Sequence, residues 1–337
     1  MPVTIHDVAK RLKLSITTVS RALDGYDDVA EETRERVVRV AREMGYVPSR
    51  AARQLRRKRA EAIGFMMPTS KPRFTDPFFS EFIAGLGDEA ASRHFDLLIS
   101  LAPPDDEAER IAYQRWIQSR RVDGIVLARM RLDDWRVRFL AEAGFPFVAF
   151  GRTRLSLNFP YIEVDGAAGM RALITHLVER GHQRIAFVTA PSKLYFQADR
   201  LAGYRAGLAE AGIAFDESLI VEDHLTRDGG YQAAHRLLSL PDRPTAIIGV
   251  NDLTAIGAMR AAHERGLVVG RDLAVAGFDG IEEAAHTQPP LTTLNQPVYE
   301  IGRRLVKMLL ALITDEPLAE RHILLQPELI VRGSTGA

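Results

Sequence analysis

The chain has 337 residues, of which 46% are hydrophobic and 26% charged, and it contains no cysteine. This composition is typical of globular proteins with two or three domains, and it excludes disulfides, cysteine-ligated zinc and thiol catalysis. The net charge is zero, yet residues 1–60 carry 14 Lys+Arg against 8 Asp+Glu, and the remaining residues carry 30 against 36. A basic head on an acidic body is typical of a DNA-binding module joined to another domain. No apolar leader or membrane-length apolar run is present, so we expect a cytoplasmic protein.

Three segments of the head have the apolar spacing of amphipathic helices, at residues 5–12, 16–23 and 31–44. Thr4 and Ser15 precede the first two segments as N-cap residues, and Gly45 follows the third as a C-terminal cap. Two short helices joined by a tight turn and covered by a third predict a helix-turn-helix domain over residues 1–46. The alternative is a three-helix subdomain whose Ser and Thr residues are only caps.

In a helix-turn-helix domain, the second helix enters the major groove, and exposed side chains in its N-terminal part reach base edges. In this chain these side chains are Ile16, Thr17 and Arg21. Arginine can make two hydrogen bonds to guanine, threonine bonds either kind of base edge, and isoleucine can contact a thymine methyl group. Small hydroxyl side chains suit phosphate oxygens, which set the register without reading sequence. The candidates for that role are Ser15, Thr18 and Ser20.

A basic segment follows at residues 47–60. Six basic groups and no acidic one lie between Arg50 and Arg59, and Ser49 precedes them as an N-cap for good helix formers. Such a short helix is unstable alone in water, so we expect it to fold when DNA supplies its partner. Leu55 stands among these charges and can wedge between base steps in a minor groove. The alternative is a solvated linker with one incidental leucine.

Three motifs of the head carry a family resemblance: Thr4-Ile5-His6-Asp7-Val8-Ala9, Ser15-Ile16-Thr17-Thr18-Val19-Ser20-Arg21-Ala22-Leu23, and Tyr46-Val47-Pro48-Ser49 through Leu55. The chain resembles the LacI/GalR (lactose/galactose repressor) family over nearly its whole length. The resemblance implies a homodimer on a pseudo-palindromic operator in double-stranded DNA, with paired hinge helices that insert Leu55. It also implies DNA contacts for Thr4, Tyr46, Ser49, Arg50, Ala52 and Arg56. The family usually has Asn at the position of Ser49, and Ser caps almost as well.

From residue 61 onwards, short apolar runs alternate with helical stretches, the pattern of parallel βαβ units. We expect strands at residues 62–67, 95–100, 124–127, 145–150, 185–188, 246–250 and 273–277. We expect helices near residues 77–93, 107–120, 133–143, 166–180, 198–211, 229–239 and 252–265. The predicted fold is therefore an all-α head with a hinge helix, followed by an α/β body of two doubly wound lobes that resembles periplasmic binding proteins.

The body should span residues 61–337 and bind its ligand between the lobes. The first lobe is expected to hold residues 61–160 and a crossover near 292–320. The second lobe is expected to hold residues 161–290 and the C-terminal strands.

Polar and aromatic side chains follow several predicted strands, where doubly wound sheets bind ligands. Asp76, Phe78 and Phe79 follow the first strand and can bond hydroxyls and stack on a sugar ring. Charged and amide groups after later strands suit a neutral ligand with many hydroxyls. These groups are Arg152, Arg200, Asn251, Asp279 and Gln296. For any single one of them, the alternative is a helix cap or a surface salt bridge.

The family resemblance implies effector-binding roles for Arg200 ahead of Leu-Ala-Gly-Tyr, for Asn251 before Asp252, and for Asp279 after Phe278. Further motifs look similar to members that control α-glucoside use, so the resemblance points to a small carbohydrate effector of that class. These motifs are Asp76-Pro77-Phe78-Phe79, Phe147-Val148-Ala149-Phe150-Gly151-Arg152 and Gly229-Gly230-Tyr231. Relative to the usual family loop, the chain carries extra residues at 69–75.

Enzyme motifs are weak or missing. Gly85, Gly87 and Ala90 fit a dinucleotide-binding spacing, but they fall inside a predicted helix, whereas that motif requires a strand-to-helix turn. No phosphate-loop, nucleophile-elbow or zincin motif is present, so we expect no catalytic site, metal, cofactor or membrane partner. We predict a transcriptional regulator, a repressor of carbohydrate-utilisation genes. The alternatives are a two-lobed sugar receptor without a DNA role, which would need a signal peptide, and a small-molecule enzyme.

Overall fold

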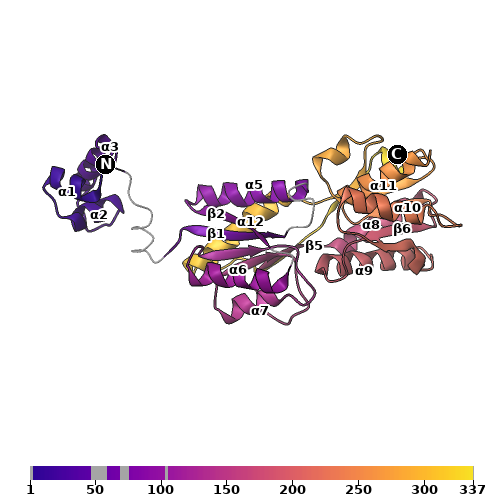
Figure 1. The fold of residues 1–337 in the computed structure, drawn as a ribbon, viewed down its shortest axis with the longest axis horizontal. Helices are drawn as coiled ribbons and strands as arrows, with labels where there is room; N and C mark the ends of the chain where they lie inside the picture. The colour runs from indigo at the N-terminus through magenta and orange to yellow at the C-terminus, as the bar shows by residue number, and fades with distance from the viewer. Residues whose placement is uncertain (1–2, 47–58, 69–75, 103–104, 337) are drawn as a thin grey trace. The chain divides into compact units, whose positions relative to one another are not determined.

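The structure is a computed structural model that describes residues 3–46, 59–68, 76–102 and 105–336 (Figure 1). The chain divides into two compact units, Met1–Ala60 and Glu61–Ala337. The expected hinge helix falls on residues 47–58, which lie outside the described part of the chain. Among the described residues, no helix is both long and apolar enough to cross a membrane.

Three helices form the first unit: α1 (Ile5–Leu12), α2 (Ile16–Leu23) and α3 (Glu31–Glu43). Ser15 caps α2, because its side-chain oxygen accepts a hydrogen bond of 3.0 Å from the backbone nitrogen of Thr18. Val8, Val19 and Val37 are fully buried at the centre of the three helices. The apolar spacing of the sequence therefore predicted all three helices correctly.

The second unit contains two sheets, and the first is entirely parallel. Its strands lie in the order β11 (His322–Leu325), β5 (Tyr161–Val164), β4 (Phe147–Phe150), β3 (Gly124–Leu127), β1 (Ala62–Pro68) and β2 (Asp96–Ala102). Its helices are α5 (Pro77–Ser92), α6 (Asp106–Gln118), α7 (Trp135–Glu142) and α12 (Val298–Thr314). Figure 1 shows α5 on one side of this sheet and α6 and α7 on the other.

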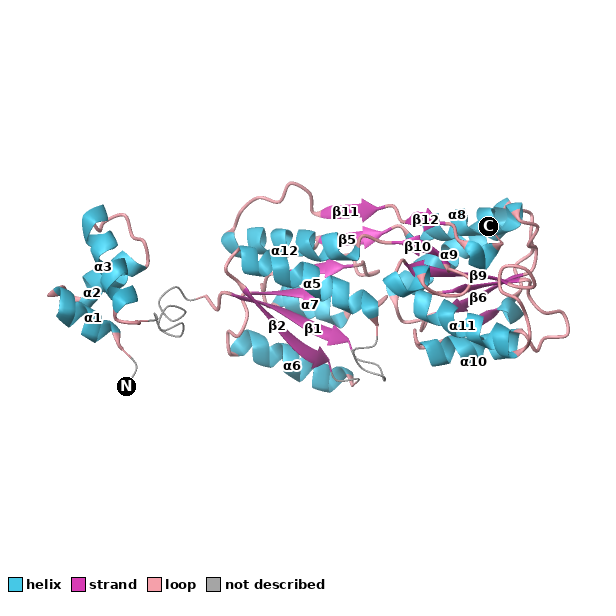
Figure 2. Ribbon diagram, turned by 90° about the horizontal axis from the view of Figure 1, so that it is seen from above, coloured by secondary structure: helices cyan, strands magenta, loops and turns pink. Residues whose placement is uncertain are grey.

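The second sheet is parallel except at one edge, where β12 runs antiparallel to β10. Its strands lie in the order β12 (Glu328–Ile330), β10 (Thr292–Asn295), β9 (Ala274–Asp279), β8 (Ala246–Gly249), β6 (Ile185–Thr189) and β7 (Ile220–Glu222). Its helices are α8 (Gly166–Glu179), α9 (Tyr195–Glu210), α10 (Arg227–Leu237) and α11 (Asp252–Glu264). In Figure 2, α8 and α9 cover one face of this sheet, and α10 and α11 cover the other. The predicted pair of doubly wound lobes is confirmed.

The chain crosses between the lobes three times: after β5, after β10, and between β11 and β12. The expected lobe boundaries need three corrections, since β5 and β11 belong to the first sheet and β10 belongs to the second. Within the crossover expected near residues 292–320, only α12 belongs to the first lobe, where it packs against α5. Strand β11 alternates between exposed and half-buried side chains, so it lacks the apolar run that marks the central strands.

Gly85 lies in the middle of α5, as predicted, and not in a strand-to-helix turn. A Cβ atom at this position would collide with the backbone carbonyl of Tyr299 in α12. The glycine therefore serves the close approach of two helices, which explains the dinucleotide-like spacing without a nucleotide.

Candidate functional site

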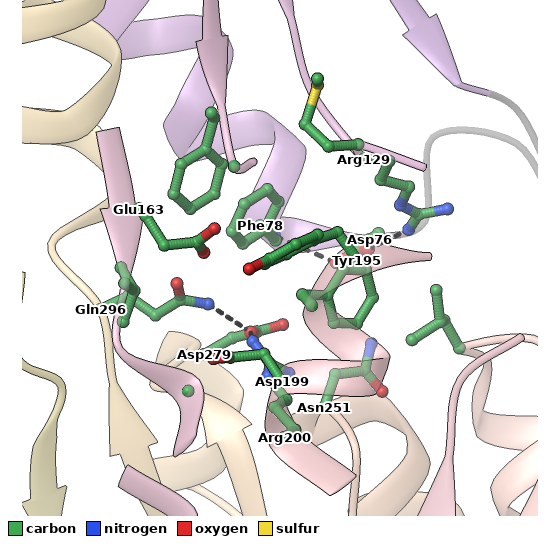
Figure 3. Close-up of a pocket in the computed structure, with 17 residues that line it drawn as sticks. Asp76, Phe78, Arg129, Glu163, Tyr195, Asp199, Arg200, Asn251, Asp279 and Gln296 are labelled. Atoms are coloured by element: carbon green, nitrogen blue, oxygen red, sulfur yellow. Dashed lines mark hydrogen bonds and ion pairs between the residues drawn. The ribbon is translucent and has the colours of Figure 1, made fainter. Parts of the chain in front are cut away.

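A cavity lies between the two lobes (Figure 3). Its walls come from segments that follow the carboxyl ends of strands in both sheets, and from the start of α5 and α9. Ligands of doubly wound folds bind at such strand ends. The lining residues are Asp76, Phe78, Arg129, Met130, Phe150, Gly151, Glu163, Val164, Gly166, Tyr195, Phe196, Asp199, Arg200, Leu225, Asn251, Asp279 and Gln296.

Arg200 on α9 lies at the base of this cavity and is only 7% exposed. Its guanidinium group donates a hydrogen bond to the carbonyl of Val250 and lies 3.4 Å from the ring centroid of Phe278. Nη2 of Arg200 lies 3.7 Å from Oδ1 of Asp279, at the end of β9. These contacts fix the plane of the guanidinium group, so its position is set before any ligand enters.

Asp279 is held in an unusual conformation beside Arg200. Its backbone φ is +114°, which is uncommon for a residue other than glycine and stores strain at the end of β9. Nε2 of Gln296 donates a hydrogen bond of 2.6 Å to Oδ1 of Asp279. Burial raises the pKa of the Asp279 carboxyl group well above its usual value, and Arg200 opposes this rise. The surrounding structure thus holds a carboxyl group in a costly position, which is a property of binding sites.

Asn251 and Asp252 connect β8 to α11 and have different roles. Oδ1 of Asn251 caps α11 by accepting a 2.9 Å hydrogen bond from the backbone nitrogen of Thr254, and its amide nitrogen points towards the cavity (Figure 3). The carboxyl group of Asp252 is fully buried and accepts hydrogen bonds from the Thr293 hydroxyl at 2.5 Å and the Ile281 backbone nitrogen at 2.8 Å. Burial raises the pKa of Asp252 to about 7. Asp252 therefore ties three strand ends together, while Asn251 offers a donor to a ligand.

The first lobe contributes a second ion pair to the cavity. Asp76 caps α5 by accepting a 3.2 Å hydrogen bond from the backbone nitrogen of Phe78. Nη2 of Arg129 donates a 3.1 Å hydrogen bond to the other oxygen of Asp76. Burial raises the pKa of Asp76, and Arg129 opposes the rise. Each arginine that lines the cavity thus has a carboxylate partner.

Aromatic rings form one wall of the cavity. The ring of Phe78 stacks on Phe150, with 5.9 Å between the centroids and 15° between the planes. Phe78 stacks on Phe82 in the same manner, at 6.1 Å and 18°. Tyr195 and Phe196 at the start of α9 add aromatic surface from the second lobe. Such a wall beside fixed polar groups suits the apolar face of a ring-shaped ligand that also carries hydroxyls.

The backbone joins the lobes at the rim of this cavity as well. The backbone nitrogen of Tyr195 donates to the carbonyl of Met130, and that of Leu132 donates to the carbonyl of Lys193, each at 2.9 Å. Arg136, which is buried on α7, donates hydrogen bonds to the carbonyls of Ala128 and Arg129 and so fixes the loop that carries this link. An opening of the lobes would have to break these two backbone hydrogen bonds.

Six of the predicted effector residues line the cavity: Asp76, Phe78, Arg200, Asn251, Asp279 and Gln296. The structure does not bring Phe79 to the cavity, because its ring is 3% exposed and packs in the core of the first lobe. Arg152 is not a lining residue, yet it lies over the ring of Tyr195 and 3.5 Å from Glu163, which both line the cavity.

Several lining residues were not predicted, and the strand-end rule could have found one of them, Arg129. Arg129 follows the predicted strand at residues 124–127, just as Arg152 follows the next one. Glu163 was missed because β5 is only four residues long and contains a charge, so it was not predicted as a strand. Asp199 directly precedes Arg200 and accepts a 3.0 Å hydrogen bond from the backbone nitrogen of Ala167.

The head presents a second candidate site on α2. Ser15, Ile16, Thr17 and Arg21 are exposed, as a groove-binding surface requires. The guanidinium group of Arg21 is held at this surface by a 2.6 Å ion pair with Asp28.

The other predicted DNA contacts have different environments. Thr18 is half-buried, and Thr4 is exposed and donates hydrogen bonds to Asp7 from both its hydroxyl and its backbone nitrogen. Ser20 is 6% exposed and its hydroxyl donates to Asp24, so the expectation of a phosphate contact is not supported in this conformation. Tyr46 is half-buried against the core of the head. Ser49, Arg50, Ala52, Leu55 and Arg56 lie outside the described residues.

Two parts of the chain match known protein families. Residues 4–49 match the family model "Bacterial regulatory proteins, lacI family", and residues 174–335 match "Periplasmic binding protein-like domain". The chain is 36% identical over 340 residues to the HTH-type transcriptional regulator AglR of Rhizobium meliloti (strain 1021), with 100% of this chain and 95% of the relative covered.

Several solved structures resemble the whole chain, and two of them illustrate the likeness. One is the lac repressor dimer bound to operator and the anti-inducer ONPF, with a TM-score of 0.88, 29% identity and 100% coverage of both chains. The other is a complex of the transcriptional regulator CelR with cellobiose, with a TM-score of 0.76, 32% identity, and coverage of 98% of this chain and 99% of that chain.

Proposed function

We infer the function from the premise that this chain belongs to the LacI family of bacterial regulatory proteins. Its relatives are transcriptional regulators rather than enzymes, and the chain is a DNA-binding, sugar-responsive transcriptional regulator.

The effector is a small neutral carbohydrate that binds in the cavity between the lobes. The observation that carries this proposal is the set of six predicted side chains that converge there from both lobes. Arg129 and Arg200 already have carboxylate partners, so the cavity favours a ligand without negative charge. An α-glucoside is the first candidate, because the motifs at residues 76–79 and 147–152 look similar to those of α-glucoside regulators.

The head reads an operator as part of a homodimer. Ile16, Thr17 and Arg21 contact base edges, while Ser15 and Thr18 contact phosphates at the N-terminus of α2. The surface ion pair between Arg21 and Asp28 is weak in water, so Arg21 can leave it for guanine at little cost. The basic segment 47–60 supplies hinge helices that meet at the centre of the operator.

Effector and operator are coupled through the lobes. A sugar that binds both lobes favours one relative orientation of the two, and the crossovers between the sheets let them rotate. The hinge segment directly precedes β1 of the first lobe, so a shift of the first-lobe dimer surface separates the paired hinges. The required coupling free energy is about 1–3 kcal/mol.

Selection of genomic fragments by the purified full-length protein, followed by sequencing, tests the DNA function. We expect a shared pseudo-palindrome of two half-sites, next to genes for carbohydrate uptake or breakdown. Enrichment of no sequence, with and without maltose, trehalose, sucrose and cellobiose, would contradict the proposal and favour a sugar receptor without a DNA role.

A further inference from the structure

Glu163 is a buried carboxyl group in the wall of the cavity. It lies on β5, directly before the first crossing of the chain from one lobe to the other, and is only 5% exposed. Figure 3 shows its carboxyl group pointing into the cavity, on the side of Phe78 and Gln296. No motif of the sequence marks it, and the six predicted residues of the cavity do not include it.

Arg152 satisfies the hydrogen-bonding capacity of this carboxyl group only in part. Nε of Arg152 forms an ion pair with Oε2 of Glu163 at 3.5 Å. Among the described residues, both of these buried atoms lack a hydrogen-bond partner. Because burial of an unsatisfied charged group is costly, native proteins rarely keep one without a functional reason. The burial also raises the pKa of Glu163 to about 7.

The unsatisfied pair defines the chemistry of its missing partner. Glu163 needs a donor and Arg152 needs an acceptor at neighbouring positions, and a hydroxyl group provides both. A phosphate group provides no donor when fully ionised and would face the carboxyl groups of Glu163, Asp199 and Asp279. A protonated amine provides no acceptor for Arg152. A sugar hydroxyl fits the pair best.

We propose that Glu163 and Arg152 form a hydroxyl-recognition subsite that selects a neutral sugar by one of its hydroxyl groups. This inference rests on the proposed binding of a sugar effector in the cavity. Glu163 lies on the same side of the cavity as Phe78 (Figure 3), whose ring stacks on Phe150, so a sugar ring on that aromatic wall can direct a hydroxyl towards Glu163. Arg200 and Asn251 contact the effector from the second lobe.

The experiment measures the coupling between one side chain and one hydroxyl group of the ligand. Full-length protein is titrated calorimetrically with maltose, trehalose, sucrose and cellobiose, and then with the monodeoxy derivatives of the sugar that binds most tightly. The titrations are repeated with Glu163→Gln, which keeps the size of the side chain and removes its charge. Glu328→Gln on β12 is the control, because Glu328 is exposed and lies outside the cavity.

We expect one deoxy position at which the wild type loses about 10-fold to 100-fold in affinity, the loss typical of a hydrogen bond to a charged group. For Glu163→Gln, the affinity for that deoxy derivative should be less than about 3-fold below the affinity for the parent sugar. Glu328→Gln should show the same loss of affinity as the wild type. Equal losses in wild type and Glu163→Gln at every position would overturn the subsite but leave the sugar function standing. Failure of the wild type to bind any of the four sugars would overturn both.

Arg152→Gln keeps the test decisive if Glu163→Gln does not fold. Arg152 is one-third exposed at its side chain, so its substitution disturbs the core less. In Arg152→Gln the affinity for the sugar should no longer depend on the same single hydroxyl group. An affinity that depends on this hydroxyl group as in the wild type would overturn the subsite. Glucose 6-phosphate is the anionic probe, and binding tighter than that of glucose would contradict the argument from charge.

Discussion

Replacement of Arg200 by alanine tests the cavity most severely, because it removes the central cation of a buried pair. The substitution leaves Asp279 buried with Gln296 as its remaining hydrogen-bond partner, and it exposes the faces of Phe196 and Phe278 to an empty space. Loss of one member of a buried ion pair costs about 3–5 kcal/mol. The pKa of Asp279 is already raised well above its usual value, so the carboxyl group can take up a proton. We therefore expect the lower end of that range, about 3 kcal/mol, or about 5 °C in Tm.

A second substitution separates the ion pair from simple loss of packing. In Arg200→Ala/Asp279→Asn the buried charge is removed, so the double variant should recover about 1–2 kcal/mol relative to the single variant. Unfolding of each variant in guanidinium chloride, followed by circular dichroism, gives the free energies. Both variants should lose sugar binding at least about 10-fold and keep operator affinity at temperatures well below the Tm. A single variant as stable as the wild type, or a double variant no more stable than the single, would refute the role assigned to the pair.

Three further predictions concern the loop, the strand ends and the head. Arg136→Met removes the buried partner of Asp134 and should destabilise the body by about 3–5 kcal/mol in chemical unfolding; a change below about 1 kcal/mol would contradict the assigned pairing. The pKa of Asp252 is about 7 in the folded state and lower in the unfolded state. The free energy of unfolding of the wild type should therefore fall by about 2–3 kcal/mol relative to that of Asp252→Asn between pH 5 and pH 8. A difference that does not change with pH would refute this. Arg21→Ala should lose about 1–3 kcal/mol of operator-binding free energy and relax operator specificity in a binding competition. Asp28→Ala should bind the operator a few-fold more tightly, because Asp28 no longer pairs with Arg21. Weaker operator binding by Asp28→Ala would contradict the idea that Asp28 and guanine compete for Arg21.

The sequence predicted the central elements of the fold because their side chains are buried on a strict pattern. Strands β3, β6 and β8 are buried at every position, so they appear as continuous apolar runs between helices. The edge strands β7 and β11 are different, since they are half-exposed and carry no such run. Their partners are distant in the sequence, and the strand order of each sheet identifies them.

The same limit explains the errors at the sites. Phe78 and Phe79 are adjacent in the sequence, and the direction in which α5 leaves the sheet decides which ring reaches the cavity. Ser20 follows Val19 on α2 and faces the interior with it, so its residue type was a poorer guide than its place on the helix. Strand-end polar residues were predictable as a class, whereas the unsatisfied pair of Arg152 and Glu163 depends on side-chain distances.

Operator affinity of the full-length protein with and without its sugar is the most direct test of the account. The measurement is a fluorescence-anisotropy titration of the operator obtained from genomic selection, in the presence and absence of a saturating concentration of the sugar that binds most tightly. We expect affinity to change by about 5-fold to 150-fold, which corresponds to a coupling of about 1–3 kcal/mol. A sugar that binds the cavity and leaves operator affinity unchanged would contradict the central claim.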